Sequence, residues 1–166
     1  MAARSRCPGF RPVRKDRLIK ERVHDTYKSR GKLREQTRCP QCGAVVLEGR
    51  WQWVSKAAPG HEEMCPACQR IRDRYPAGFV TVGGPFLTEH RDEILNLARN
   101  EGTKAKTEHP LKRLRKIEEQ PGGFLITTTD IHLARAIGEA LHRAYQGELD
   151  YHYNEEDYML RVNWRR

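Results

Sequence analysis

The feature that most constrains this chain is a pair of Cys-x-x-Cys motifs. Their thiols belong to Cys39, Cys42, Cys65 and Cys68, and 22 residues separate the two motifs. Each motif places two thiolates on one tight turn, and two such turns facing each other form the closed tetrahedron of a structural zinc site. Gly43 follows the first motif, where a left-handed residue would let the chain turn away from the metal. We therefore predict one structural Zn²⁺ bound by these four cysteines.

Two other uses of the thiols compete with zinc. A redox site needs one motif that opens a helix after a strand, without a matched second motif. Disulfides suit a small secreted domain better than a highly charged chain whose basic N-terminus is not followed by an apolar signal region. Cys7 is left over and is predicted to be a free thiol. Because protein sulfur fills every metal position, water and substrate have no place on the ion, so we expect a binding module and no enzyme.

Charge is distributed unevenly along the chain. Residues 1–38 hold 13 Lys and Arg against four Asp and Glu, whereas residues 39–166 hold 18 of each sign. The whole net charge of +9 therefore lies in an N-terminal arm. Such an arm can be a solvated tail, but its many arginines suit phosphate pairing and base stacking, so we expect it to bind nucleic acid. Residues 16–27 carry a weak helical pattern that we expect to order on a partner.

Size and composition limit the remaining possibilities. At 166 residues, the chain can form one ordinary domain and a small metal-bound one. Its hydrophobic content is 37%, its mean hydropathy is -0.84, and no apolar run reaches the length of a membrane span. Metal-bound reduced thiols and the absence of an export signal predict a cytoplasmic protein that makes no membrane contact.

The segment 39–75 is predicted to be a zinc ribbon. Residues 44–47 and 51–54 are expected to form short strands around a Glu48-Gly49-Arg50 turn. Trp51 and Trp53 would share a face of this ribbon, where they either cover its thin core or stack on bases.

Residues 76–166 alternate strand and helix patterns. The expected elements are strand 78–82, helix 88–101, strand 111–119, strand 124–128, helix 131–146, strand 149–153 and strand 158–164. Thr88 and Asp130 are the expected N-caps, and Gly102 and Gly147 the expected helix stops. Segment 111–119 fits a helix as well as a strand. This order predicts an α+β, ferredoxin-like (split βαβ) domain with an extra C-terminal strand, whose helices cover one face of an antiparallel sheet.

Further basic residues lie near the second motif and beside the hairpin at residues 120–123. The cluster at residues 112–116 is either a phosphate contact or solvated charge that Glu118 and Glu119 partly offset. The residues predicted to contact RNA are Arg4, Arg6, Arg11, Arg14, Lys15, Arg17, Lys20, Arg22, Lys28, Arg30, Lys32, Arg34, Arg38, Arg70, Arg72, Arg74, Lys112, Arg113, Arg115 and Lys116.

From Cys65-Pro66-Ala67-Cys68-Gln69-Arg70 through the predicted strand 149–153, the chain resembles a known family. This family is the large-ribosomal-subunit export adaptor (nonsense-mediated mRNA decay protein three) of archaea and eukaryotes, in its zinc-binding N-terminal region. The resemblance covers roughly residues 39–155 and matches Cys39, Cys42, Cys65 and Cys68 to the family's zinc ligands. It implies contact with ribosomal RNA and ribosomal proteins, on the large subunit.

This chain departs from the family in ways that limit the comparison. It lacks a second four-cysteine site, the additional β-domains and the long export tail, and it adds the basic arm. Nuclear export is therefore not implied, and a compact prokaryotic relative is the better match. We expect a zinc-stabilised ribosome-binding factor that acts in ribosome hibernation, protection or assembly. The alternative is a zinc-ribbon DNA-binding transcriptional regulator or subunit.

Overall fold

The computed structural model describes residues 25–29, 31–56, 60–154 and 156–166. Most of the predicted arm, including Cys7, lies outside these residues. The helix predicted over residues 16–27 also lies almost wholly outside them, and its last residues, 25–27, lead into a turn. No helix in the described ranges has both the length and the apolar character that crossing a membrane requires.

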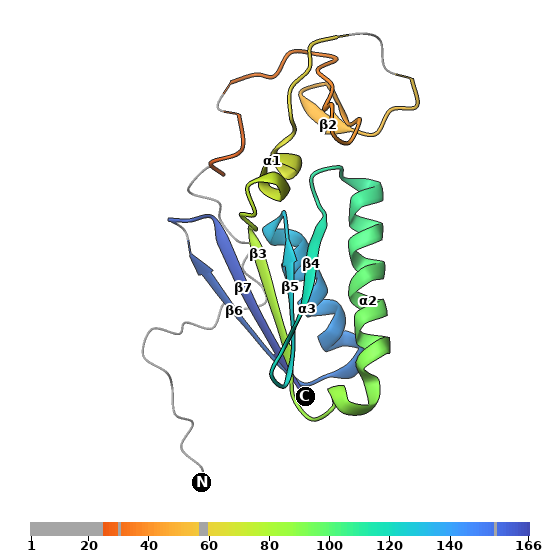
Figure 1. Ribbon diagram of the computed structural model, residues 1–166, viewed down its shortest axis with the longest axis vertical. Coiled ribbons are helices and arrows are strands. Elements are labelled where there is room, and N and C mark those ends of the chain that lie inside the picture. The colour runs from red at the N-terminus through yellow and green to blue at the C-terminus, as the bar shows by residue number, and fades with distance from the viewer. Residues whose placement is uncertain (1–24, 30, 57–59, 155) are drawn as a thin grey trace.

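The described chain forms a small two-stranded sheet and a larger five-stranded sheet with two long helices (Figure 1). The elements in chain order are β1 (Val45–Leu47), β2 (Arg50–Gln52), α1 (Pro66–Arg72), β3 (Gly78–Gly83), α2 (Leu87–Glu108), β4 (Leu114–Gln120), β5 (Gly123–Thr128), α3 (Ile131–Tyr145), β6 (Glu148–Asn154) and β7 (Met159–Arg165). The sequence predicted all of these except α1, and the ambiguous segment 111–119 is a strand from residue 114 onward.

The predicted hairpin is present, and each of its strands is one residue shorter than expected. β1 and β2 pair antiparallel around Glu48 and Gly49, whose φ angles of 52° and 73° are both left-handed. A two-residue turn with two positive φ angles matches the right-handed twist of the strands it joins. The carboxylate of Glu35 accepts hydrogen bonds from both turn N–H groups, each at 2.9 Å. The chain before Cys39 is therefore tied to the hairpin.

The large sheet is mixed, where the sequence pattern predicted an antiparallel one. Its order is β4-β5-β3-β7-β6, and β3 and β7 are parallel while the other neighbours are antiparallel. The extra strand β7 therefore lies inside the sheet and β6 forms the edge. Leu160, Val162 and Trp164 of β7 are almost wholly buried, whereas β6 exposes Glu148 and Asp150. The more apolar strand takes the interior position and the charged strand takes the edge, where unpaired backbone groups face water.

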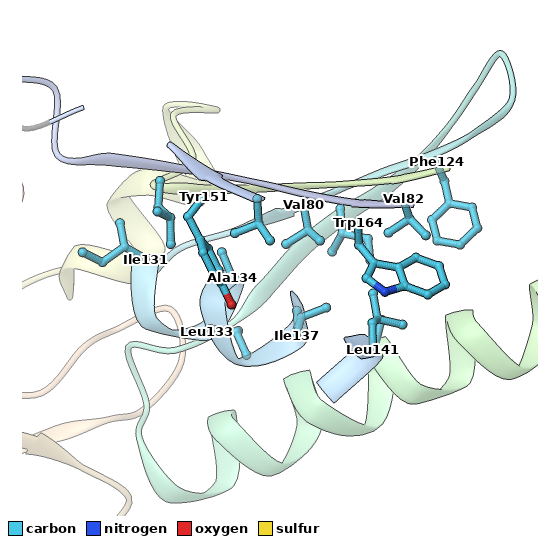
Figure 2. Packing of buried hydrophobic residues seen from close by; sticks show 14 of the residues in the cluster. Val80, Val82, Phe124, Ile131, Leu133, Ala134, Ile137, Leu141, Tyr151 and Trp164 are labelled. Atoms are coloured by element: carbon cyan, nitrogen blue, oxygen red, sulfur yellow. The ribbon is translucent and has the colours of Figure 1, made fainter. Parts of the chain in front are cut away.

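The main core lies between the large sheet and α3. Figure 2 shows Val82, Phe124 and Trp164 projecting from the sheet toward Ile137 and Leu141 of α3. Helix α2 packs beside α3 on the same side, so the opposite sheet face carries exposed residues. Gly138 allows the close approach of α3 because a Cβ at this position would lie 2.5 Å from Val162. Leu133, Ala134, Ile137 and Leu141 of α3 are buried in this core.

Helix α3 begins as the sequence predicted. Asp130 is its N-cap, and the carboxylate accepts a hydrogen bond of 3.0 Å from the N–H of Leu133. We expect Asp130→Ala to lower the free energy of unfolding by about 1 kcal/mol, because the first turn loses this acceptor. Asp130→Asn keeps a capping oxygen and should stay close to the wild type. Urea denaturation of the three proteins measures the difference, and equal losses in both variants would contradict the capping role.

Both predicted bounds of α2 are wrong. The helix begins at Leu87, and Thr88 is not its N-cap. Phe86 occupies the N-cap position without a side-chain hydrogen bond, and its ring packs against His90 and Trp164. Gly102 does not stop the helix. It lies inside α2 and is buried, and a Cβ there would come within 3.0 Å of Leu114 of β4. The helix instead ends before Pro110, since the residue preceding proline is driven to an extended conformation.

Candidate metal centre

The four cysteine sulfurs of the two motifs converge on one point. The Sγ atoms of Cys39, Cys42, Cys65 and Cys68 all lie within 4.8 Å of one another, and the Cys42 and Cys65 sulfurs are 3.8 Å apart. A tetrahedral zinc with bonds of about 2.3 Å separates its sulfurs by about 3.8 Å. The cysteines are thus close enough to hold one metal ion. This clustering confirms the spatial prediction drawn from the spacing of the motifs.

The first motif is a tight turn before β1. The N–H of Gly43 donates to the carbonyl of Cys39 at 2.9 Å, and the N–H of Cys39 donates to Ala44 at 2.8 Å. Gly43 has a φ of 79°, which is the left-handed conformation that its sequence position predicted. This turn brings Cys39 and Cys42 to the same side and leads the chain away into the hairpin.

The second motif opens α1, a helix that the sequence analysis did not foresee. Cys65 is the N-cap residue, and its sulfur accepts a hydrogen bond of 3.5 Å from the N–H of Cys68. Pro66 occupies the first helical position, where its fixed φ and missing N–H are favourable. The N–H of Cys65 donates to Cys39 Sγ at 3.3 Å and links the two motifs. Proline directly after a potential capping residue was the signal that could have revealed this helix.

The cluster is shielded from water. Cys39, Cys65 and Cys68 are buried and Cys42 is half-buried. Trp51 packs against the cluster, where it covers part of the small core around the cysteines. Trp53 follows the end of β2 and is exposed. Its indole N–H donates to the carbonyl of Lys106 at 2.6 Å, and the guanidinium carbon of Arg113 lies 5.8 Å from its ring centre.

Arg113 is the one guanidinium that touches the sulfur cluster among the described residues. Its Nη1 lies 3.3 Å from Cys68 Sγ and its Nη2 3.7 Å from Cys65 Sγ, while its Nε donates to the carbonyl of Pro110 at 2.7 Å. Only 8% of the residue is exposed. Arg113 therefore joins the cysteine segment to the loop before β4, and we remove it from the residues predicted to contact RNA.

Electrostatics at the cluster favour a negative charge on the sulfur of Cys42 and disfavour one on the sulfurs of Cys65 and Cys68. A hydrogen bond with Cys65 is the main cause that lowers the pKa of Cys42, and Arg113 lowers it further. The same hydrogen bond, followed by burial, raises the pKa of Cys65, and burial raises that of Cys68. Burial alone would lower the pKa of Arg113, but contacts with the sulfurs of Cys42 and Cys68 more than offset this, so its pKa is raised. A bound cation would complete the charge balance that Arg113 begins.

Arg70 is the second predicted RNA contact that the structure places inside the molecule. It is 1% exposed and forms an ion pair with Asp25. Its guanidinium carbon lies 4.6 Å from the ring centre of Tyr27 and 5.7 Å from that of Tyr75. Arg70 thus ties the chain before the hairpin to α1. A phosphate cannot reach this buried group, so we remove Arg70 from the predicted contacts as well.

The other predicted RNA contacts occupy several environments. The exposed ones in the described chain are Lys28, Lys32, Arg34, Arg38, Arg72, Arg74 and Lys116, and the half-buried ones are Lys112 and Arg115. Two of the exposed residues are paired: Arg72 with Asp73 at 2.7 Å and Lys116 with Glu118 at 2.5 Å. The predicted contacts outside the described residues are Arg4, Arg6, Arg11, Arg14, Lys15, Arg17, Lys20, Arg22 and Arg30.

The hairpin, the cysteine cluster and α1 lie together beyond one end of the five-stranded sheet (Figure 1). No family model, curated protein or solved structure matches the chain. The resemblance to the export adaptor family therefore rests on the motif spacing and the order of elements in this sequence.

Proposed function

We propose that this protein is a zinc-stabilised ribosome-binding factor whose basic arm contacts ribosomal RNA. The single observation that carries the proposal is the convergence of four protein thiols on one ion-sized space, in a chain whose whole basic excess precedes that point. The metal would hold shape. All four tetrahedral positions are protein sulfur, which leaves none for a reacting water or substrate. We therefore assign the protein to binding and not to catalysis.

Zinc is the metal we propose for the centre. Four thiolates in a tetrahedral arrangement favour zinc over the oxygen-preferring cations. The ion would fix the two turns of a zinc ribbon, since the small core around Cys39, Cys65 and Ala67 buries little apolar surface. The C-terminal unit is then a variant of the ferredoxin-like arrangement, in which β7 is inserted between β3 and the edge strand β6.

The charge distribution supports RNA as the partner. Lys28, Lys32, Arg34 and Arg38 are exposed and extend the basic excess of the arm up to the cysteine cluster. A folded domain with a long cationic extension suits structured RNA, because the arm neutralises phosphates along a groove while the domain fixes its position. The large subunit, the cytoplasm and a role in hibernation, protection or assembly are proposed on the family resemblance alone.

Sedimentation through sucrose gradients tests this proposal, with lysates of growing and starved cells. We expect the protein to travel with ribosomes or large subunits and to leave them as salt rises. Residues 1–24 carry eight Lys and Arg against two Asp and Glu. If the arm neutralises about six phosphates, a plot of the logarithm of the binding constant against the logarithm of the salt concentration should have a slope of about -4 to -5. Deleting residues 1–24 should remove most of that slope while it preserves the pair of Asp25 with Arg70.

A variant in which the eight Lys and Arg of residues 1–24 become glutamine is the matched control. It keeps the length of the chain and should lose the salt dependence as the deletion does. An unchanged slope in both variants would refute the role of the arm. Ribosome fractions without the protein, together with tight retention on duplex DNA, would favour the regulator alternative.

A further inference from the structure

A cavity of about 540 Å³ lies where the cysteine segment meets the end of the five-stranded sheet. We call it the junction cavity, and the residues that matter to its chemistry are Lys28, Lys32, Trp51, Met64, Leu111 and Lys112. These residues come from the chain before the hairpin, from β2, from the approach to α1 and from the loop before β4. Its volume falls within the roughly 300–1,000 Å³ typical of small-ligand sites.

One part of the cavity lining is apolar and partly aromatic. Trp51 is half-buried, with its inner side against the cysteine cluster, and Met64 and Leu111 pack against the same cluster. An indole held in this way is a rigid surface on which a flat ring can stack at little entropic cost. Stacking on an aromatic side chain tolerates any base, because every base has a π-face.

The lining also carries a small excess of positive charge, with Lys28, Lys32, Arg50 and Lys112 against Asp25, Glu63 and Asp130. Lys28, Lys32 and Lys112 have no ion-pair partner within residues 25–29, 31–56, 60–154 and 156–166. Asp25 pairs with Arg70, which is not part of the lining, so Glu63 and Asp130 are the carboxylates that face the four basic side chains. Three lysines beside an apolar wall fit a ligand that joins an anion to a flat aromatic ring.

We propose that the junction cavity binds one unpaired nucleotide of single-stranded RNA, with its base on Trp51 and its phosphate among Lys28, Lys32 and Lys112. This inference rests on the proposed RNA-binding function and gives it a defined site. Nucleotide chemistry satisfies both parts of the lining, whereas an acidic peptide would leave the apolar wall unused. The arm would supply salt-dependent affinity, and the cavity would select bases that are free of pairing.

Tryptophan fluorescence of the full-length, zinc-loaded protein tests the base site. We expect a single-stranded adenine octamer of RNA to quench the emission of the wild type. Trp51→Phe should abolish that quenching and keep a stacking ring, so that affinity falls by less than about fivefold. Trp53→Phe is the matched control and should retain the quenching. Equal quenching in the two variants would overturn the assignment of the base site.

Calorimetric titration of the same octamer tests the phosphate site. Lys112→Gln should weaken binding and flatten the log–log salt slope by about 0.7, the value for one lost phosphate contact with a single strand. Lys104→Gln removes the same charge from an exposed position of α2, outside the cavity and outside the predicted RNA contacts, and should leave the slope nearly unchanged. Equal effects of the two substitutions would show non-specific attraction and overturn the proposal. Zinc content close to one per chain verifies that every variant is folded.

Two competing ligands separate RNA from its alternatives. Adenosine monophosphate shares the chemistry of the base and phosphate, and we expect it to bind more weakly than the octamer, with the same loss of signal in Trp51→Phe. Tighter binding of the monophosphate than of the octamer would overturn the assignment to RNA. If polyglutamate displaces the octamer and reverses the quenching of Trp51 fluorescence, the assignment to RNA would be overturned in favour of an acidic peptide. If the protein associates with ribosomes but the Trp51 and Lys112 substitutions do not change octamer binding, the cavity proposal alone is refuted. If these substitutions weaken octamer binding but the protein does not associate with ribosomes, the ribosome proposal alone is refuted.

Discussion

Replacing Cys39 with serine should abolish stoichiometric zinc binding and unfold the segment between Asp25 and Tyr75. The core around the metal contains few buried side chains, so the ion must supply most of the folding free energy there. For a site of this kind that contribution is on the order of 10 kcal/mol. The α+β unit has its own core, with residues such as Ile126, Ile137 and Trp164 almost wholly buried, and should stay folded.

Metal analysis and limited proteolysis measure this effect together. We expect about one zinc per wild-type chain, none in Cys39→Ser, and rapid tryptic cleavage at the basic residues of the unfolded segment. Cys7→Ser is the matched control, because Cys7 is the one cysteine of the sequence outside the two Cys-x-x-Cys motifs. It should keep its zinc and its resistance to trypsin. A metal-free wild type with a fully ordered hairpin would contradict the assignment of a structural metal.

Lowering the pH should also release the metal. Metal binding requires thiolates, so protons compete with the ion and affinity falls as the pH falls. Arg113 partly opposes this loss, because its contact is one of the causes that lower the pKa of Cys42. The metal should therefore be released at a higher pH once the guanidinium of Arg113 is removed.

Local sequence patterns predicted the parts of this molecule that local physics decides. The apolar period of α3 and the capping residue Asp130 specify a helix without reference to the rest of the chain. Cysteine spacing predicted the metal cluster for a similar reason, since two tight turns offer few ways to arrange four sulfurs around one ion. The left-handed Gly43 follows from the same geometry.

Features that depend on distant segments could not be read in this way. The position of β7 inside the sheet depends on a comparison of burial between two strands, and no local pattern records which strand will be central. Gly102 looks like a helix stop until Leu114 of β4 is known to pack against it. Arg113 belongs to a basic run in which charge alone does not distinguish the buried residue from its exposed neighbours. Arg70 could have been found, because helix α1 places it three residues after the buried Ala67.

Arg113→Ala should destabilise the protein by about 3–5 kcal/mol, the cost of removing one partner from a buried charged contact. Two effects add to this loss. The sulfurs of Cys65 and Cys68 lose the guanidinium donors, and the loop before β4 loses the bond from Arg113 to the carbonyl of Pro110. Arg113→Lys keeps the charge but lacks the planar fork that reaches two sulfurs and a carbonyl, so it should restore only part of the stability.

The position of Arg113 beside the cluster makes zinc affinity the sharper readout. Groups that hydrogen-bond to metal ligands change affinity by about 10- to 100-fold when they are removed, and we expect Arg113→Ala to fall in this range. Competition with a chromophoric chelator measures the affinity, and urea denaturation measures the stability. Lys116→Ala is the matched control, because Lys116 lies three residues away on β4, is exposed and pairs through its side chain with Glu118. A loss of zinc affinity no larger in Arg113→Ala than in Lys116→Ala would mean that the guanidinium only fills space. A selective loss would mean that the charge of the metal centre is balanced from the α+β unit, so that the metal and the sheet stabilise each other.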